Sequence, residues 1–147
     1  MRNKIYIING PNLNFLGTRE PNKYGKVTIT ELEKKCKSAC EKNKLDFVFF
    51  QSNHEGEIVE KIQDVIGNVD AIIINAAAFT HTSVAIFDAL SMFNGLIIEI
   101  HMTNIYSREN FRHNSYISKI AKGIIAGFGV QSYIIAINSV NQLLEIK

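Results

Sequence analysis

The stretch AIIINAAAFTHTSVAIFDALSMFNGLIIEIH, residues 71–101, decides the fold class of this 147-residue chain. At its two ends, residues 71–75 and 96–100 are apolar runs of strand length that are rich in the β-branched residue isoleucine. Between them, residues 80–93 repeat apolar side chains at the spacing of a helix and end at an Asn-Gly pair. A strand, a helix and a strand in this order predict two parallel strands that are joined by a right-handed helical crossover.

The same alternation continues in both directions along the chain. Three further apolar runs predict strands at residues 5–9, 47–51 and 123–127. Three further segments have helical period: residues 28–43, from near residue 53 to 67, and 130–146. Strands that are apolar on both faces need helices on both sides of the sheet. The sequence therefore predicts an α/β fold with a doubly wound five-stranded parallel sheet in a three-layer α/β/α sandwich, and a single domain over residues 1–147.

The first predicted helix has two possible starts and carries both cysteines. Overlapping capping boxes at residues 28–31 and 30–33 can each open it. Cys36 and Cys40 share one face of this helix, but their spacing does not favour a strain-free disulfide. We therefore interpret them as a pair of part-buried thiols.

Composition and charge argue against several classes of protein. With 46% hydrophobic residues and only 9 Gly and 2 Pro, the chain is neither disordered nor low in complexity. Its 16 basic and 14 acidic residues form no long block of either sign, so nucleic acid is not an expected partner. The longest uncharged stretch, residues 123–144, contains several Asn, Gln and Ser residues, which argues against a membrane span. No pattern of a secretory signal opens the sequence, and we expect a cytoplasmic protein.

Polar side chains follow the predicted strands at the edge of the sheet where the carboxyl ends of parallel strands meet. The segments are Asn9-Gly10-Pro11-Asn12, Gln51-Ser52-Asn53-His54, Asn75, Glu99 with His101, and Gly127-Phe128-Gly129. Open α/β sheets bind ligands at this edge, near the point where the strand order reverses. We therefore expect the functional site here, with the long connection of residues 10–26 as a mobile lid.

Glu99 and His101 stand two apart at the end of an apolar strand, so their side chains point to the same face of the sheet. Burial of an unpaired acid is costly, and a charged hydrogen bond to an imidazolium would roughly offset that cost. A histidine that a carboxylate keeps cationic can act as a general acid near neutral pH. A polar pair in the core without a catalytic role is the alternative interpretation.

Tyr24 lies in the predicted lid, close to Arg19 in the sequence. It is either an exposed loop tyrosine or a base, and a base would need one or two nearby arginines in a dry site to stabilise the phenolate. Arg108, Arg112 and His113 follow the fourth strand and form either a solvated charged turn or an anion clamp. The sequence leaves both pairs of alternatives open.

Metal and nucleotide chemistry find little support in the sequence. The histidines other than His101, which are His54, His81 and His113, form no HExxH motif and no Cys/His pair at zinc spacing. Gly127 and Gly129 form only a broken glycine fingerprint in the fifth strand unit, whereas a dinucleotide motif belongs in the first. We expect neither a metal nor a cofactor.

Four long motifs cover much of the chain: INGPNLNFLGTREPNKYG at residues 8–25, FQSNHEGEI at 50–58, NAAAFTHTSVAIFDAL at 75–90 and EIHMTNIYSRENFRHNS at 99–115. Together they closely resemble the type II 3-dehydroquinate dehydratases, or type II dehydroquinases. The likeness runs in register from about Lys4 to the last predicted helix, and so covers nearly the whole chain. It implies a flavodoxin-like five-stranded fold, which agrees with the fold class predicted above.

The resemblance implies a lyase that removes water from 3-dehydroquinate by anti elimination to give 3-dehydroshikimate, the third step of the shikimate pathway, without metal, cofactor or Schiff base. In this family pattern Tyr24 would be the base that removes a proton α to the ketone, and Arg19 would keep it ionised. Asn12 would position a water that stabilises the enolate intermediate. His101, oriented by Glu99, would protonate the departing hydroxyl.

The resemblance also implies how the substrate is held and how the enzyme assembles. The carboxylate and hydroxyls of the substrate would be bound by Asn75, His81 and Arg112 and by backbone amides at Met102 and Thr103, with Arg108 supporting the lid. Asp88 would reach across a trimer interface toward the neighbouring site, in a homododecamer of four trimers. The charged fraction of 20%, below the usual value of about 25%, also suggests surface that is buried between subunits.

The chain departs from the family's usual motifs at few positions. Thr103 stands where Ser is usual, Ala76-Ala77 where Pro-Gly is frequent, and Ser132 where Gly is common. We expect these departures to alter fine loop geometry and to leave the chemistry intact.

The alternative from a different functional class is a non-catalytic flavodoxin-like module that binds flavin or a phosphoryl group. A phosphoryl receiver would carry an acidic cluster at the end of its first strand, where this chain has Asn9 and Gly10. A flavin binder would be yellow as purified.

Overall fold

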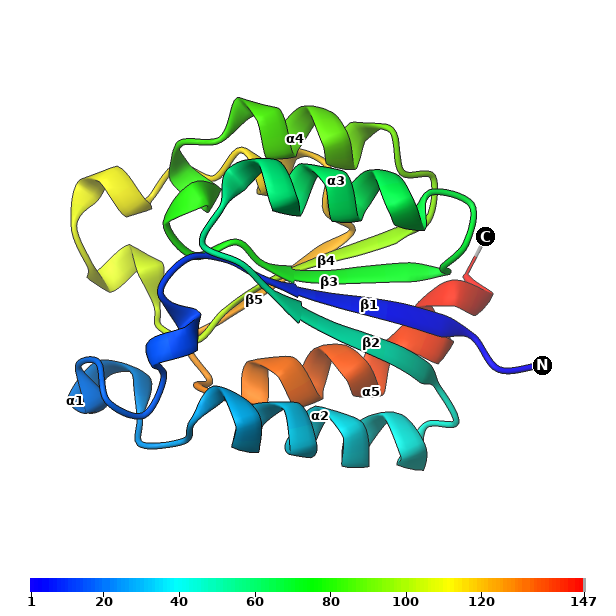
Figure 1. Cartoon of the computed structure of the whole chain (residues 1–147), viewed down its shortest axis with the longest axis horizontal. Coiled ribbons are helices and arrows are strands. Elements are labelled where there is room, and N and C mark those ends of the chain that lie inside the picture. Colours follow the sequence, from blue (N-terminus) through cyan, green and yellow to red (C-terminus); the bar gives the residue numbers. More distant parts are fainter. Residues whose placement is uncertain (147) are drawn as a thin grey trace.

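Five parallel strands form one sheet in the order β2-β1-β3-β4-β5 (Figure 1). In the computed structural model, which describes residues 1–146, the strands are β1 (Lys4–Asn9), β2 (Asp46–Gln51), β3 (Ala71–Asn75), β4 (Leu96–His101) and β5 (Gly123–Ala126). Each predicted strand is confirmed, with ends that differ by at most one residue. The strand order is the flavodoxin-like one, so the predicted doubly wound α/β fold is confirmed as well. Lys147, the last residue of the predicted domain, lies outside the described residues.

Four helices cover the two faces of the sheet. α2 (Ile29–Lys42) and α5 (Gln131–Glu145) lie on one face, and α3 (Glu55–Val65) and α4 (Val84–Ser91) lie on the other (Figure 1). The remaining helical segments are short: η1 (Leu13–Phe15), α1 (Pro21–Tyr24), η2 (Ala77–His81), η3 (Ile105–Ser107), η4 (Asn110–Arg112) and η5 (Ile117–Lys119). Within residues 1–146, no helix has the length and apolar character needed to cross a membrane.

The alternation of side chains along the strands divides the core between the two faces. Ile7 of β1 and Ile73 of β3 pack in the cluster under α2 and α5, whereas Ile8 and Ile74 pack in the cluster under α3 and α4. All four side chains are fully buried, and each contributes about 1.5–3 kcal/mol by leaving water. The centre of the sheet is therefore apolar on both faces, and polar groups are confined to the strand ends.

Side-chain caps set the start of two helices. Thr28 Oγ1 accepts a hydrogen bond from the backbone amide of Glu31 at 3.2 Å, so the first of the two possible starts is the one that α2 uses. Ser83 Oγ accepts one from the Ile86 amide at 2.9 Å. This cap starts α4 at Val84, inside the predicted segment of residues 80–93, and the residues before it form the short helix η2.

Cys36 and Cys40 lie deeper than the sequence predicted. Both are free thiols whose side chains are fully buried rather than part-buried. Burial raises the pKa of each thiol to about 12, with smaller electrostatic contributions from nearby groups. The two cysteines are therefore unreactive core residues of α2.

β1 and β3 are neighbours in the sheet, but the chain leaves them toward opposite faces, to α2 and to α4. This divergence opens a crevice at their carboxyl ends, where Asn9 and Asn75 pair in register. The Gly10 amide donates to the Asn75 carbonyl at 2.8 Å. A Cβ at Gly10 would lie 2.2 Å from the carbonyl oxygen of Ala76, so only glycine fits there.

We predict that Gly10→Ala lowers the free energy of unfolding by about 3 kcal/mol, because backbone atoms of Ala76 would have to move. Gly56→Ala is the matched control, since residue 56 lies in α3 and a Cβ there meets nothing within 4 Å. The control should be neutral or stabilising by up to about 1 kcal/mol. Urea unfolding of both variants measures the difference, and a Gly10→Ala variant as stable as the parent would contradict the close approach.

Candidate active site

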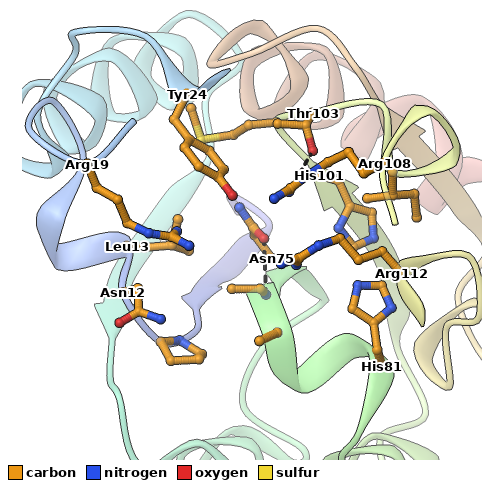
Figure 2. Close-up of a pocket in the computed structure, with 15 residues that line it drawn as sticks. Asn12, Leu13, Arg19, Tyr24, Asn75, His81, His101, Thr103, Arg108 and Arg112 are labelled. Carbon is orange, nitrogen blue, oxygen red and sulfur yellow. Dashed lines mark hydrogen bonds between the residues drawn. The ribbon is translucent and has the colours of Figure 1, made fainter. Parts of the chain in front are cut away.

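A pocket lies at the carboxyl edge of the sheet, beside the crevice between β1 and β3 (Figure 2). Ten of the predicted site residues line it: Asn12, Arg19, Tyr24, Asn75, His81, His101, Met102, Thr103, Arg108 and Arg112. The lining is completed by Pro11, which belongs to the predicted polar edge, and by four residues that were not predicted: Leu13, Ala77, Ala78 and Ile105. These four are apolar, so nothing in their chemistry marks them in a sequence.

Some residues of the predicted polar edge do not line the pocket. Glu99 lies behind His101. Asp88, which was predicted to reach a neighbouring subunit's site and not its own pocket, is exposed on α4. Residues 51–54 and 127–129 are also absent from the lining. The prediction was too broad here because it placed every strand end at the same edge without knowing which connections fold over it.

Residues 51–54 instead form hydrogen bonds to the start of the connection of residues 10–26. Gln51 Nε2 donates to the Gly10 carbonyl at 3.1 Å, and Asn53 Oδ1 accepts from the Asn12 amide at 2.9 Å. Asn12 has a left-handed backbone with φ of 70°, a conformation that Asn tolerates better than most residues. The connection after β2 therefore helps to hold Asn12 in place.

The departures from the family motifs have visible consequences. Ala77, where Gly is frequent, has a left-handed backbone with φ of 51°, which costs a non-glycine residue about 1–3 kcal/mol. Ser132 Oγ donates to the His101 carbonyl at 3.0 Å and accepts from the Phe128 amide at 3.3 Å. Ser132 thus ties the turn after β5 to the end of β4, and Ala77 carries strain at the pocket wall.

Glu99 and His101 form a buried pair at the end of β4. The His101 Nε2–H donates to Glu99 Oε2 at 2.5 Å, and the two side chains are 5% and 1% exposed. Two hydroxyls also donate to the carboxylate: Ser115 Oγ at 2.8 Å and Ser118 Oγ at 2.5 Å. The pairing follows from the strand period, whereas the two serines come from a later loop and carry no signal in the sequence.

These donors decide the charge of Glu99. Burial alone would raise the pKa of its carboxyl group, but hydrogen bonds from His101, Ser118 and Ser115, with the positive charge of the imidazole, lower that pKa below its usual value. Glu99 is therefore an anion at neutral pH. Because Nε2 of His101 is engaged with Glu99, Nδ1 is the ring nitrogen left to exchange a proton with a ligand.

Two guanidinium groups lie against the ring of Tyr24. The Cζ of Arg19 is 5.0 Å from the ring centroid, and the Cζ of Arg108 is 5.5 Å from it. Figure 2 shows the Tyr24 hydroxyl pointing toward the middle of the pocket. The Arg108 side chain is 12% exposed and that of Arg19 is 41% exposed, so water screens the charge of Arg108 less. Both arginines therefore bring positive charge close to the Tyr24 ring.

In the charged turn after β4, the two arginines line the pocket and His113 does not. Arg108 and Arg112 line the pocket, where they can bind an anion. Arg108 Nη1 donates to Thr103 Oγ1 at 3.3 Å. The hydroxyl group of Thr103, which the usual Ser would also supply, therefore has a hydrogen-bond partner. Nε2–H of His113 donates to the Arg108 carbonyl at 3.1 Å, outside the pocket. His113 therefore shapes the turn.

His81 faces the pocket as a neutral imidazole. Its Nδ1–H donates to the Asn114 carbonyl at 2.8 Å, which leaves Nε2 as a hydrogen-bond acceptor. Burial lowers the pKa of His81 and the hydrogen bond to Asn114 opposes that effect, while the charges of His101 and Arg112 lower the pKa further. The rings of His81 and His101 stack with centroids 6.4 Å apart. Within residues 1–146, no group of three or more His, Cys, Asp or Glu side chains could hold a metal ion.

Comparison with known proteins identifies relatives of this chain. The family model described as dehydroquinase class II matches residues 3–141. The 3-dehydroquinate dehydratase of Endomicrobium trichonymphae is 52% identical over 141 residues, which cover 96% of this chain and 99% of the relative. The 3-dehydroquinate dehydratase of Cereibacter sphaeroides is 47% identical over 143 residues, which cover 97% of each protein.

A solved structure shares the fold over nearly its full length. The type II dehydroquinase from Butyrivibrio crossotus superposes with a TM-score of 0.92 at 44% sequence identity. The match covers 95% of this chain and 98% of that protein. Every residue that lines the pocket falls within the region that the family model matches.

We predict that Glu99→Gln removes a pH-dependent part of the stability. The folded pKa of Glu99 lies below its unfolded value of about 4.3, so its carboxylate stabilises the fold above that pH. This contribution is lost as the pH falls through the folded pKa. The parent should exceed the variant by about 3 kcal/mol near pH 7, and the difference should shrink below about pH 4.

Thermal unfolding over this pH range measures the difference. Glu60→Gln, which changes an exposed acid of α3, is the control and should follow the parent at every pH. A difference between parent and Glu99→Gln that stays constant with pH would show that the carboxylate is not the stabilising form.

Proposed function

Since this chain belongs to the class II dehydroquinase family, we propose that the pocket residues carry out the family's reaction in the roles that follow. The chain is a lyase that converts 3-dehydroquinate to 3-dehydroshikimate in the shikimate pathway, by anti elimination of water through an enolate intermediate. The alternative of a non-catalytic flavin- or phosphoryl-binding module is not supported by any of these relatives.

The position of Tyr24 is the observation that carries the proposed roles. Its hydroxyl points into the pocket while Arg19 and Arg108 lie against its ring. A phenolate in this position is the base that removes the proton α to the substrate's ketone. Arg108, the less exposed of the two arginines, shares with Arg19 the task of keeping the phenolate ionised.

His101 supplies the second proton transfer. Removal of the α proton forms the enolate. When the enolate collapses to the enone, the carbon–oxygen bond to the leaving hydroxyl breaks, and that oxygen takes a proton from His101. Glu99 stabilises the cationic imidazole before this step and fixes the ring through Nε2. One proton leaves carbon for Tyr24 and one passes from His101 to hydroxide, so the step balances without an oxidant, a reductant or a cofactor.

The remaining pocket residues hold the substrate and its intermediate. Asn12, on the lid side, positions a water that donates to the enolate oxygen. His81 presents an acceptor nitrogen that suits a substrate hydroxyl. The carboxylate and the other hydroxyls are bound by Asn75, Arg112 and the backbone amides at Met102 and Thr103.

We also propose that the single catalytic domain assembles into a homododecamer of four trimers. Val84, Asp88 and Met92 follow one another at four-residue intervals, so they share one side of α4 and its end. Val84 is 52% exposed and Met92 is 50% exposed, which leaves apolar surface on both sides of Asp88. A partner subunit would cover this surface, and Asp88 would then lie at the edge of the partner's pocket.

A cytoplasmic location completes the proposal, because the substrate and product are small water-soluble acids of metabolism. No nucleic acid or membrane takes part in the reaction.

We predict that Tyr24→Phe lowers kcat about a thousandfold, because it deletes the base, while the fold stays intact. Tyr106→Phe is the matched control, since Tyr106 is 59% exposed and lies outside the pocket lining. Steady-state kinetics and circular dichroism on both variants provide the test. Turnover by Tyr24→Phe within tenfold of the parent would exclude Tyr24 as the base.

We predict that Asp88→Ala weakens the trimer, substrate binding or both, although Asp88 contributes nothing to the pocket of its own subunit. Asp64→Ala, which changes an exposed acid of α3, should leave mass and kinetics unchanged. Light scattering and steady-state kinetics measure the two effects. If Asp88→Ala matches the parent in both, Asp88 is an ordinary solvated acid and the interface lies elsewhere.

A further inference from the structure

A chain of buried hydrogen bonds runs beneath the pocket and ties the ends of β1 and β3 to α5. The hydroxyl of Tyr133, on α5, donates to Asn9 Oδ1 at 2.6 Å and accepts from Asn75 Nδ2 at 2.9 Å. Tyr133 and Asn9 are fully buried, and Asn75 is 4% exposed. Of the three residues only Asn75 lines the pocket, and Tyr133 has no part in the mechanism above.

The direction of each hydrogen bond in this series follows from the contact between Asn9 and the backbone of Phe50. Asn9 Nδ2 donates to the backbone carbonyl of Phe50 at 3.1 Å, and a carbonyl can only accept. Asn9 therefore turns its Oδ1 toward Tyr133, whose single proton goes to that oxygen. The oxygen of Tyr133 is then left as an acceptor, so Asn75 must present its Nδ2 to it.

The backbone amide of Ala77, at the other end of this series of hydrogen bonds, favours the same orientation of the Asn75 amide. Asn75 Oδ1 accepts from the Ala77 amide at 3.2 Å, and a backbone amide can only donate (Figure 2). One N–H of Asn75 goes to Tyr133, and the second has no acceptor within residues 1–146 although the side chain is almost fully buried. A buried donor at a pocket wall without a protein partner points to an acceptor on a ligand.

The protonation state of Tyr133 fixes its role in this series of hydrogen bonds. Burial raises the pKa of its hydroxyl well above the usual value, and the hydrogen bond from Asn75 opposes this only in part. Tyr133 is therefore a neutral phenol with one proton to donate.

We propose that Tyr133 is a positioning residue that holds the Asn75 amide with its free N–H toward an acceptor oxygen of the substrate. Without the Tyr133 hydroxyl, only the 3.2 Å hydrogen bond from the Ala77 amide still favours this orientation, and a reversed amide would turn its carbonyl oxygen toward that acceptor. This role rests on the proposed function for the identity of the substrate, whereas the orientation of the amide does not depend on it.

Tyr133→Phe removes the hydroxyl and keeps the ring. We expect KM for 3-dehydroquinate to rise about tenfold and kcat to change less than KM. The pH profile of kcat should keep its shape, because Tyr24 and His101 are untouched. Tyr6→Phe is the matched control, since Tyr6 lies on β1 and its hydroxyl makes no hydrogen bond within residues 1–146. The control should have the parent's kinetic constants.

A double-mutant cycle separates positioning from a general loss of structure. If Tyr133 acts through Asn75, adding Tyr133→Phe to Asn75→Ala raises KM no further. KM increases that multiply, or a Tyr133→Phe variant with the parent's KM, would overturn the proposed positioning and leave the proposed function in place.

Neutron diffraction tests the orientation without turnover, because it distinguishes an amide nitrogen from an oxygen. In the parent and in Tyr6→Phe, Asn75 should have one orientation with Nδ2 toward Tyr133, and in Tyr133→Phe it should be reversed or mixed. A single unchanged orientation in Tyr133→Phe would overturn the proposal. The expected orientations in a protein that fails to dehydrate 3-dehydroquinate would instead overturn only the proposed function.

Discussion

The close approach of Gly10 to the backbone of Ala76 is the constraint on which the pocket depends. It joins the two connections that leave β1 and β3 toward opposite faces of the sheet. The connection after β1 carries Tyr24, and the connection after β3 carries His81. Because the two connections touch where they begin, neither can shift there without the other, and this shared frame precedes both the proposed base and the substrate-binding groups in the chain.

Within this frame the site keeps opposite charges apart. Arg19 and Arg108 place positive charge against the ring of Tyr24, the proposed base. Glu99 places a buried negative charge behind His101, the proposed acid. An elimination needs both groups, since one proton must be removed and another delivered at the same pH.

Much of this arrangement could be predicted from the sequence, but only where it depends on local backbone geometry. Apolar runs predicted all five strands, and the strand period predicted the pairing of Glu99 with His101. Spacing could not separate Arg112, which lines the pocket, from His113, which does not, because that distinction depends on the path of a loop. Nothing in the sequence marks Tyr133, because its hydroxyl reaches the strand ends only through the packing of α5 on the sheet. Apart from the general-acid role of His101, the proposed roles of the pocket residues came from resemblance to a family and not from spacing.

The central claim is that this pocket eliminates water from 3-dehydroquinate with its own side chains. The most direct measurement is the ultraviolet absorbance of purified, chelator-treated protein mixed with 3-dehydroquinate, because the conjugated enone of the product absorbs and the substrate does not. We predict a steady rise in absorbance that borohydride treatment in the presence of substrate does not abolish. No rise from a folded protein, or a rise that disappears after chelation or borohydride treatment, would contradict the claim.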